Sequence, residues 1–144
     1  MPVFESTQST LPEIEPGSPR MRGRQVPLLT VLYHPDPSRI GDTLQVGSRE
    51  DTLLGRHDGA FSAARGRARP RPLEDRYLSR MPLRLKSAGG GVSVSRPEGV
   101  NTVTADGLPL RDARVFSSRE LDRGVLLVLA RRLVLLLHYA PAQE

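Results

Sequence analysis

Arg56, Ser79, Arg80 and Asn101 are the residues in this chain whose types and spacing suggest chemistry. Each lies in a turn at one end of a short apolar or alternating run. A guanidinium offers paired donors to a phosphate, and a hydroxyl can serve a further phosphate oxygen. An amide side chain can donate to and accept from an extended backbone. The four residues therefore predict a site for a phosphorylated peptide, if the fold brings their turns together.

Five neighbouring positions are expected to support these turns: Gly55, Val100, Thr102, Asp106 and Gly107. Gly55 would let the backbone turn so that the next side chain projects. The Asp106-Gly107 pair is interpreted first as hairpin chemistry and second as a ligand contact.

Each site residue also has a plainer interpretation. Arg56 and Arg80 can be ordinary surface charges in an arginine-rich chain. Ser79 can be a turn serine that bonds its own backbone, and Asn101 can be an Asx-turn residue.

The elements that must position these residues are predicted to be strands. Turn signals recur about every 8–12 residues, which is typical of an all-β sandwich. Pro109 indicates a sheet edge for its strand. The expected strands cover residues 28–34, 43–46, 52–56, 83–86, 92–95, 101–105, 108–110 and 113–116, and residues 118–123 are expected to form a helical turn or loop.

The apolar stretch 125–137 permits either one helix or two strands. As a membrane span it is too short and carries Arg131 and Arg132 near its middle. Two strands joined across these arginines match the spacing of the preceding segments. The hairpin is therefore favoured, and no membrane contact is expected.

Composition excludes several classes of function. The 144 residues include no cysteine, which removes disulfides and thiolate metal sites. The three histidines lack ligand spacing, and no phosphate loop with lysine or nucleophile motif is present. We therefore expect no enzyme activity, catalytic residue, metal or cofactor. The start of the chain shows no secretory signal, which favours a cytoplasmic protein.

The domain organisation follows from composition. Residues 1–26 are expected to be a disordered arm, 27–140 one domain, and 141–144 the start of a linker or tail. Residues 57–74 form a long connection, interpreted as a mobile insertion that Phe61 alone pins down. The net charge of +5 suggests nucleic-acid binding as a possible function. However, the basic cluster 65–71 is more typical of a solvated loop, so direct DNA contact is not expected.

The order of four motifs along the chain resembles that of the forkhead-associated (FHA) domain. These motifs are Gly55-Arg56, Ser79-Arg80, Asn101 and Asp106-Gly107. Residues 29–41, 72–80 and 123–129 are similar to the FHA sensor domains at the N-termini of bacterial sigma-54-dependent transcriptional activators. The likeness spans roughly residues 28–139. It implies an FHA/SMAD-like fold, a two-sheet antiparallel β-sandwich of about 10–11 short strands.

The resemblance also implies roles for the site. Arg56 and Ser79 would hold the phosphate of a phosphothreonine, Asn101 the peptide backbone, and Arg80 either one. The chain departs from the family at Pro82, where a histidine commonly buttresses the loop, and at Thr102, where a glycine is usual. The loop must then be held by other means, such as the rigidity of the proline.

The implied function is a phosphothreonine-peptide-binding sensor in a sigma-54-dependent regulator, coupling Ser/Thr kinase signalling to transcription. Its partners would be a Ser/Thr kinase or a kinase substrate, and a downstream ATPase domain of the same full-length protein. The first alternative is an FHA-like interaction scaffold that needs no phosphate. A basic nucleic-acid-binding protein is the least favoured alternative.

Overall fold

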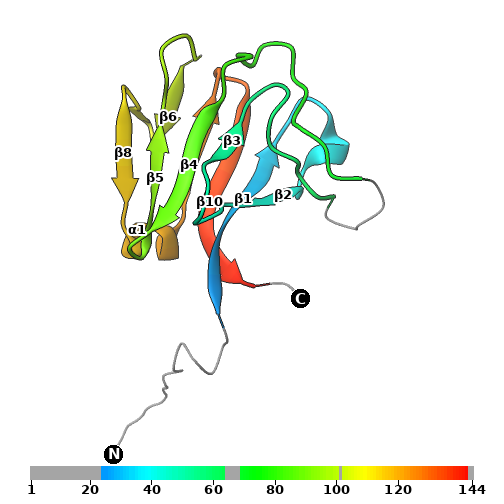
Figure 1. The fold of residues 1–144 in the computed structure, drawn as a ribbon. Helices are drawn as coiled ribbons and strands as arrows, with labels where there is room; N and C mark the ends of the chain where they lie inside the picture. Colours follow the sequence, from blue (N-terminus) through cyan, green and yellow to red (C-terminus); the bar gives the residue numbers. More distant parts are fainter. Residues whose placement is uncertain (1–23, 64–68, 101, 143–144) are drawn as a thin grey trace, which may run out of the picture. The chain divides into compact units, whose positions relative to one another are not determined.

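The computed structural model describes residues 24–63, 69–100 and 102–142, and in this part of the chain ten strands form two antiparallel sheets (Figure 1). The six-stranded sheet has the order β2-β1-β10-β9-β6-β7, and the four-stranded sheet has the order β3-β4-β5-β8. This confirms the predicted all-β, two-sheet antiparallel sandwich. The strands are β1 (Gln25–Tyr33), β2 (Thr43–Gln45), β3 (Thr52–Leu54), β4 (Leu83–Ala88), β5 (Gly91–Ser95), β6 (Val103–Ala105), β7 (Leu108–Pro109), β8 (Ala113–Phe116), β9 (Val125–Leu129) and β10 (Leu133–Pro141).

The chain divides into two units, residues 27–139 and a terminal unit of residues 1–26 with 140–144. Within the terminal unit the Ala142 N–H donates to the Arg24 carbonyl at 2.9 Å. β1 begins at Gln25 and β10 continues to Pro141, because their backbones pair beyond the expected domain limits. The predicted arm and tail are therefore each shortened, and residues 1–23 and 143–144 lie outside the described residues.

Two hairpins follow the turn chemistry of the sequence. Asp106 and Gly107 have φ values of 50° and 83°, and Ala105 pairs with Leu108 across them. Both central residues of a tight hairpin turn need positive φ, which Asp-Gly tolerates well. β7 lies at a sheet edge, as Pro109 predicted. The second hairpin joins β9 to β10, so the two-strand interpretation of residues 125–137 is confirmed.

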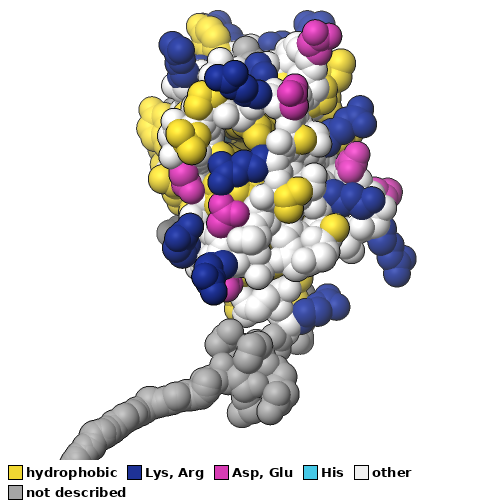
Figure 2. All heavy atoms as spheres, turned by 90° about the vertical axis from the view of Figure 1, so that its left-hand side faces the viewer, with side chains coloured by type: hydrophobic (Ala, Val, Ile, Leu, Met, Phe, Trp, Pro, Cys, Tyr) yellow, Lys and Arg dark blue, Asp and Glu magenta, His cyan; other side chains and the backbone are white. Residues whose placement is uncertain are grey.

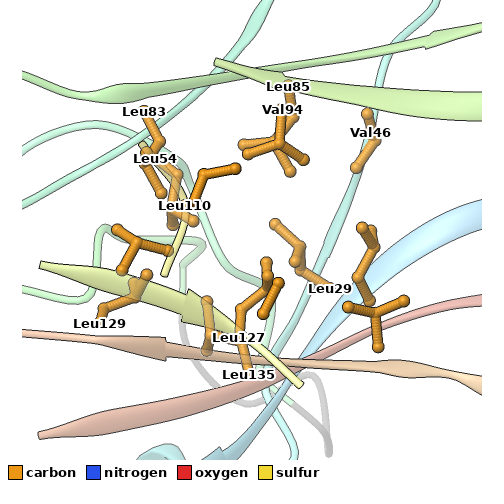
Figure 3. Packing of buried hydrophobic residues seen from close by; sticks show 14 of the residues in the cluster. Leu29, Val46, Leu54, Leu83, Leu85, Val94, Leu110, Leu127, Leu129 and Leu135 are labelled. Atoms are coloured by element: carbon orange, nitrogen blue, oxygen red, sulfur yellow. The ribbon is translucent and has the colours of Figure 1, made fainter. Parts of the chain in front are cut away.

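The core lies between the two sheets of the unit 27–139. Leu83, Leu85 and Val94 from the four-stranded sheet point toward side chains of the six-stranded sheet (Figure 3). Leu127 and Leu135 face them and are fully buried. Alternation along each strand puts these residues on one face of the sheet.

The connection over residues 57–74 is held at more points than the sequence indicated. Leu73 is as deeply buried as Phe61, and Phe61 forms a bridge with Arg71. Arg39, itself 2% exposed, donates to the carbonyls of Arg71, Pro72 and Leu73 at 2.9–3.3 Å. The prediction that Phe61 alone pins this connection is therefore wrong. Residues 64–68, the centre of the expected mobile insertion, lie outside the described residues.

The segment predicted as a helical turn or loop is an α-helix, α1 (Ser118–Arg123), with a capping box at its start. The Ser117 hydroxyl accepts from the Glu120 N–H, and the Glu120 carboxylate accepts from the Ser117 N–H. In the described part of the chain, no helix has the length and apolar character needed to cross a bilayer.

Candidate functional site

The two ends of the connection between β3 and β4 are packed together. The Arg56 N–H donates to the Ser79 carbonyl at 3.2 Å. A methyl group added at Gly55 would lie 3.2 Å from the Pro82 Cα and 3.4 Å from the Ser79 carbonyl oxygen. Gly55 is not among the glycines with positive φ. It therefore serves close packing of the loops, and not the turn flexibility expected from the sequence.

The turn after β5 meets the same loops. The Ser79 hydroxyl donates to the Gly99 carbonyl at 3.2 Å. Val100 and Thr102, which follow Gly99 in the chain, line one apolar recess together with Gly55 and Ser79. Three of the predicted turns thus converge at one end of the sandwich, the upper end in Figure 1. Asn101 itself lies outside the described residues.

The Arg56 guanidinium faces inward, toward the segment that ends at Ser79. Its Nε donates to the Leu78 carbonyl at 2.9 Å, and its Nη2 donates to the Arg76 carbonyl at 2.6 Å. The Arg56 carbonyl also accepts from the Glu74 N–H. Arg56 is half-buried, and its Nη1 has no hydrogen bond with any residue that the structure describes. Arg56 therefore fixes the shape of the Ser79 loop and retains donors on Nη1.

Arg80 contrasts with Arg56. Its side chain is exposed and makes no hydrogen bond or ion pair with the described residues. Ser79, beside it, is half-buried with its hydroxyl toward the Gly99 turn. Arg80 thus follows Ser79 directly in the chain and carries a guanidinium that none of the described residues engages.

The recess between these loops is small and mostly apolar. It has a volume of about 20 Å³, which is room for one water-sized or methyl-sized group. Its walls include Leu78, Met81, Val100, Leu129 and Ala130. A methyl group entering beside Ser79 would therefore meet carbon atoms.

The Ser79 loop is also tied to the β9–β10 hairpin, by an ion pair that the sequence did not reveal. The Arg132 Nε and Nη2 donate to the two carboxylate oxygens of Asp75 at 2.9 and 3.2 Å. Asp75 is 7% exposed, and its hydrogen bonds raise the pKa of Arg132. The Arg132 guanidinium also lies 4.2 Å from the centroid of the Tyr77 ring. With Arg56, this pair ties the loop that ends at Ser79 to the rest of the sandwich.

Two further arginines hold neighbouring loops. Arg96 donates to the Val100 carbonyl at 2.8 Å and to the Arg111 carbonyl at 3.2 Å, which fixes the turn before Thr102. Arg39 pairs with the buried Asp42 at 2.7 Å while it holds residues 71–73. Sequence reasoning missed both, because arginines are ordinarily exposed and carry no local signal of burial.

Asp106 and Gly107 do not join the site. Thr102 precedes β6 at the converging loops, whereas Asp106 follows β6 at its other end. The Asp106 carboxylate accepts from the Leu126 N–H at 2.9 Å, and the Asp106 N–H donates to the Leu126 carbonyl. The structure thus engages Asp106 in hairpin chemistry.

On the face that Figure 2 shows, charged side chains of the described residues are dispersed. Figure 2 shows basic side chains spread over one face, with acidic side chains among them and no continuous basic stripe. Within residues 24–63, 69–100 and 102–142, no group of three metal-ligating side chains occurs. One ring nitrogen of His34 is hydrogen-bonded to the Leu73 carbonyl, and the other accepts a hydrogen bond from the Asp36 N–H.

No protein-family model matches the chain, and no curated protein matches it.

Proposed function

We propose that this chain is a phosphothreonine-peptide-binding module with an FHA-like fold and site. The observation that carries the proposal is the convergence of Gly55-Arg56, Ser79-Arg80 and Val100 at one end of the sandwich. Arg80 provides guanidinium donors for the phosphate, and the Ser79 hydroxyl would turn its O–H from the Gly99 carbonyl to a phosphate oxygen. Arg56 shapes their loop and adds its Nη1 donors. As the sequence suggests, the module would serve as the cytoplasmic sensor of a sigma-54-dependent regulator.

The apolar recess supports threonine as the phosphorylated residue. A phosphate held at Ser79 and Arg80 places the adjoining carbon atoms near the recess that Ser79 lines. The methyl group of phosphothreonine can fill about that volume, whereas phosphoserine leaves it empty. A preference for phosphothreonine over phosphoserine is therefore part of the proposal.

A second function is favoured by one observation. Two donor groups of the Arg56 guanidinium are engaged by carbonyls within the protein, so fewer remain for a ligand. An FHA-like scaffold that binds a partner through these loops without phosphate would not need further donors from Arg56. The two functions differ in whether binding depends on the phosphate group.

The test is fluorescence anisotropy with a degenerate phosphothreonine peptide library and its unphosphorylated twin. We expect binding to the phosphorylated library only. Arg80→Gln removes charge-assisted hydrogen bonds of about 1.5–3 kcal/mol each, so affinity should fall about tenfold or more. Ser79→Ala should also weaken binding, because it removes the hydroxyl and its link to the Gly99 turn.

Lys86→Gln is the matched control, since Lys86 is an exposed cation on β4. It should leave affinity unchanged and so exclude a general charge effect. Equal binding of both libraries would support the scaffold. A folded protein that binds neither library would contradict the phosphopeptide proposal.

A further inference from the structure

Two residues before Ser79, the Tyr77 ring is flanked in a stack by two arginines, of which only Arg132 has a role in holding the Ser79 loop. The guanidinium carbons of Arg132 and Arg76 lie 4.2 and 5.0 Å from the centroid of one ring, that of Tyr77. Arg76 also donates through Nη2 to the Tyr77 hydroxyl at 3.2 Å. Cations over an aromatic face are held by its quadrupole, so both guanidinium groups are oriented before any ligand arrives.

The stack has an excess of positive charge. Its one acid, Asp75, is buried and already accepts two hydrogen bonds from Arg132. Arg76 makes no ion pair with any residue that the structure describes, and Tyr77 is 49% exposed. An anion that reaches Tyr77 therefore meets the open donors of Arg76.

Other charged groups near the stack do not cancel this excess. Arg131, next to Arg132 in the β9–β10 turn, and Arg80 are exposed cations. Glu74 is paired with Arg71 at 3.2 Å. Glu98, in the turn that accepts from Ser79, is an exposed acid. Residues 75–80, with the turns at Glu98 and at Arg131, thus carry four arginines, Arg76, Arg80, Arg131 and Arg132, and two acids, Asp75 and Glu98.

The stack is within reach of a peptide bound at Ser79. Tyr77 is two residues from Ser79, so their Cα atoms are at most about 7 Å apart. An extended peptide advances about 3.3 Å per residue. A side chain one to three residues from the phosphothreonine can therefore reach the stack.

We propose that Arg76, Tyr77 and Arg132 form a subsite for an acidic side chain, Asp or Glu, that flanks the phosphothreonine. This inference rests on the proposed function and adds a sequence preference to it. Arg132 is held by Asp75 and positions Tyr77, while Arg76 supplies the accessible donors. The partner is thus a phosphothreonine segment with an acidic neighbour.

The test uses one phosphothreonine peptide that binds the wild-type protein. Each position from three residues before to three after the phosphothreonine is set in turn to Glu, Gln or Lys. At one or two positions we expect Glu to bind about three- to fivefold more tightly than Gln, and Lys more weakly, as for a partly exposed ion pair. The preference should shrink as salt is raised.

Arg76→Gln should abolish this preference while binding stays phosphate-dependent, because Arg76 holds no other loop through its side chain. Arg76→Glu should turn the preference toward Lys. The control is Arg123→Gln, an exposed arginine on α1, which should keep the preference for Glu.

The outcomes separate the two proposals. Phosphate-dependent binding with equal affinities for Glu, Gln and Lys at every position would overturn the acidic subsite alone, as would a preference that survives Arg76→Gln. Failure to bind any phosphothreonine peptide would overturn both. Arg76-dependent binding of a single-stranded oligonucleotide, stronger than that of the peptides and steeply salt-dependent, would assign the stack to nucleic acid instead.

Discussion

At the scale of single residues, arginine does two different tasks at the converging loops. Arg56 donates to two carbonyls within the protein, whereas Arg80 is exposed and uncommitted. A planar guanidinium can span two carbonyls because its donors point in fixed directions. A lysine ammonium at position 56 would not reproduce this geometry.

Arg56→Ala should therefore loosen the Ser79 loop as well as weaken ligand binding. We expect the free energy of unfolding to fall by about 1–3 kcal/mol, since two carbonyls lose charged donors. Amide hydrogen exchange at Leu78 and Ser79 should become faster. Urea unfolding and hydrogen exchange followed by NMR measure these effects.

Arg84→Ala is the control, because Arg84 is exposed and its ion pair with Asp51 is long, at 3.9 Å. It should change stability by no more than about 0.5 kcal/mol. If Arg56→Ala were as mild and left exchange at Leu78 unchanged, Arg56 would not be the residue that positions this loop.

At the scale of elements, α1 shows how a short helix is held at its start. Its first turn is closed by the capping box between Ser117 and Glu120, and Arg114 lies 2.9 Å from the same carboxylate. The pKa of Glu120 is lowered from its ordinary value of 4.5, mainly because its carboxylate accepts a hydrogen bond from the Ser117 N–H. The charge of Arg114 lowers this pKa further. A lowered pKa means that the folded state favours the ionised form.

Glu120→Gln should therefore have a pH-dependent effect on stability. The wild-type advantage should be complete above about pH 4.5, the ordinary value. It should be lost as pH falls through the lower pKa of the folded state, because the carboxyl is then protonated in both states. Urea midpoints of both proteins between about pH 7 and pH 3 measure the difference.

Asp122→Asn is the comparison for this effect, since Asp122 is an exposed acid on the same helix. It keeps the capping box between Ser117 and Glu120, so its urea midpoints should stay close to those of wild type. A Glu120→Gln difference that stayed constant down to pH 3 would contradict the role of the ionised carboxylate.

At the scale of the whole unit 27–139, the two sheets share one core. Leu85 from the four-stranded sheet and Leu127 from the six-stranded sheet belong to the same buried cluster. The chain has no cysteine, so no disulfide supports this core. Stability must come from packing and from the loop contacts described above.

Leu85→Ala and Leu127→Ala should each lower the free energy of unfolding by about 2–5 kcal/mol, because both side chains are fully buried. Each variant should still unfold in a single transition, with coincident circular dichroism and tyrosine fluorescence. Leu108→Ala, at a side chain that is 62% exposed, should cost little. Separate transitions for the two leucine variants would show that the sheets do not unfold as one unit.

Most of the fold could be predicted from the sequence because its signals are local. Alternation along residues 83–86 places one face in the core, and Asp106-Gly107 accepts the positive φ of a tight turn. The hairpin over residues 125–137 followed from segment spacing and from the two arginines at its centre. The convergence of the turns at Gly55, Ser79 and Val100 agrees with the order in which the sequence presents them, and their use as a binding site stays a prediction.

Packing of the sheets and loops determines which arginine holds a loop and which one is exposed. Arg39, Arg56 and Arg132 each hold a loop segment that lies 20 to 57 positions away in the sequence. Asp75 and Tyr77 gain their roles from Arg132, which no local pattern connects to them. Periodicity and turn chemistry are properties of neighbouring residues, whereas these contacts exist only after the sheets have packed and brought distant loops together.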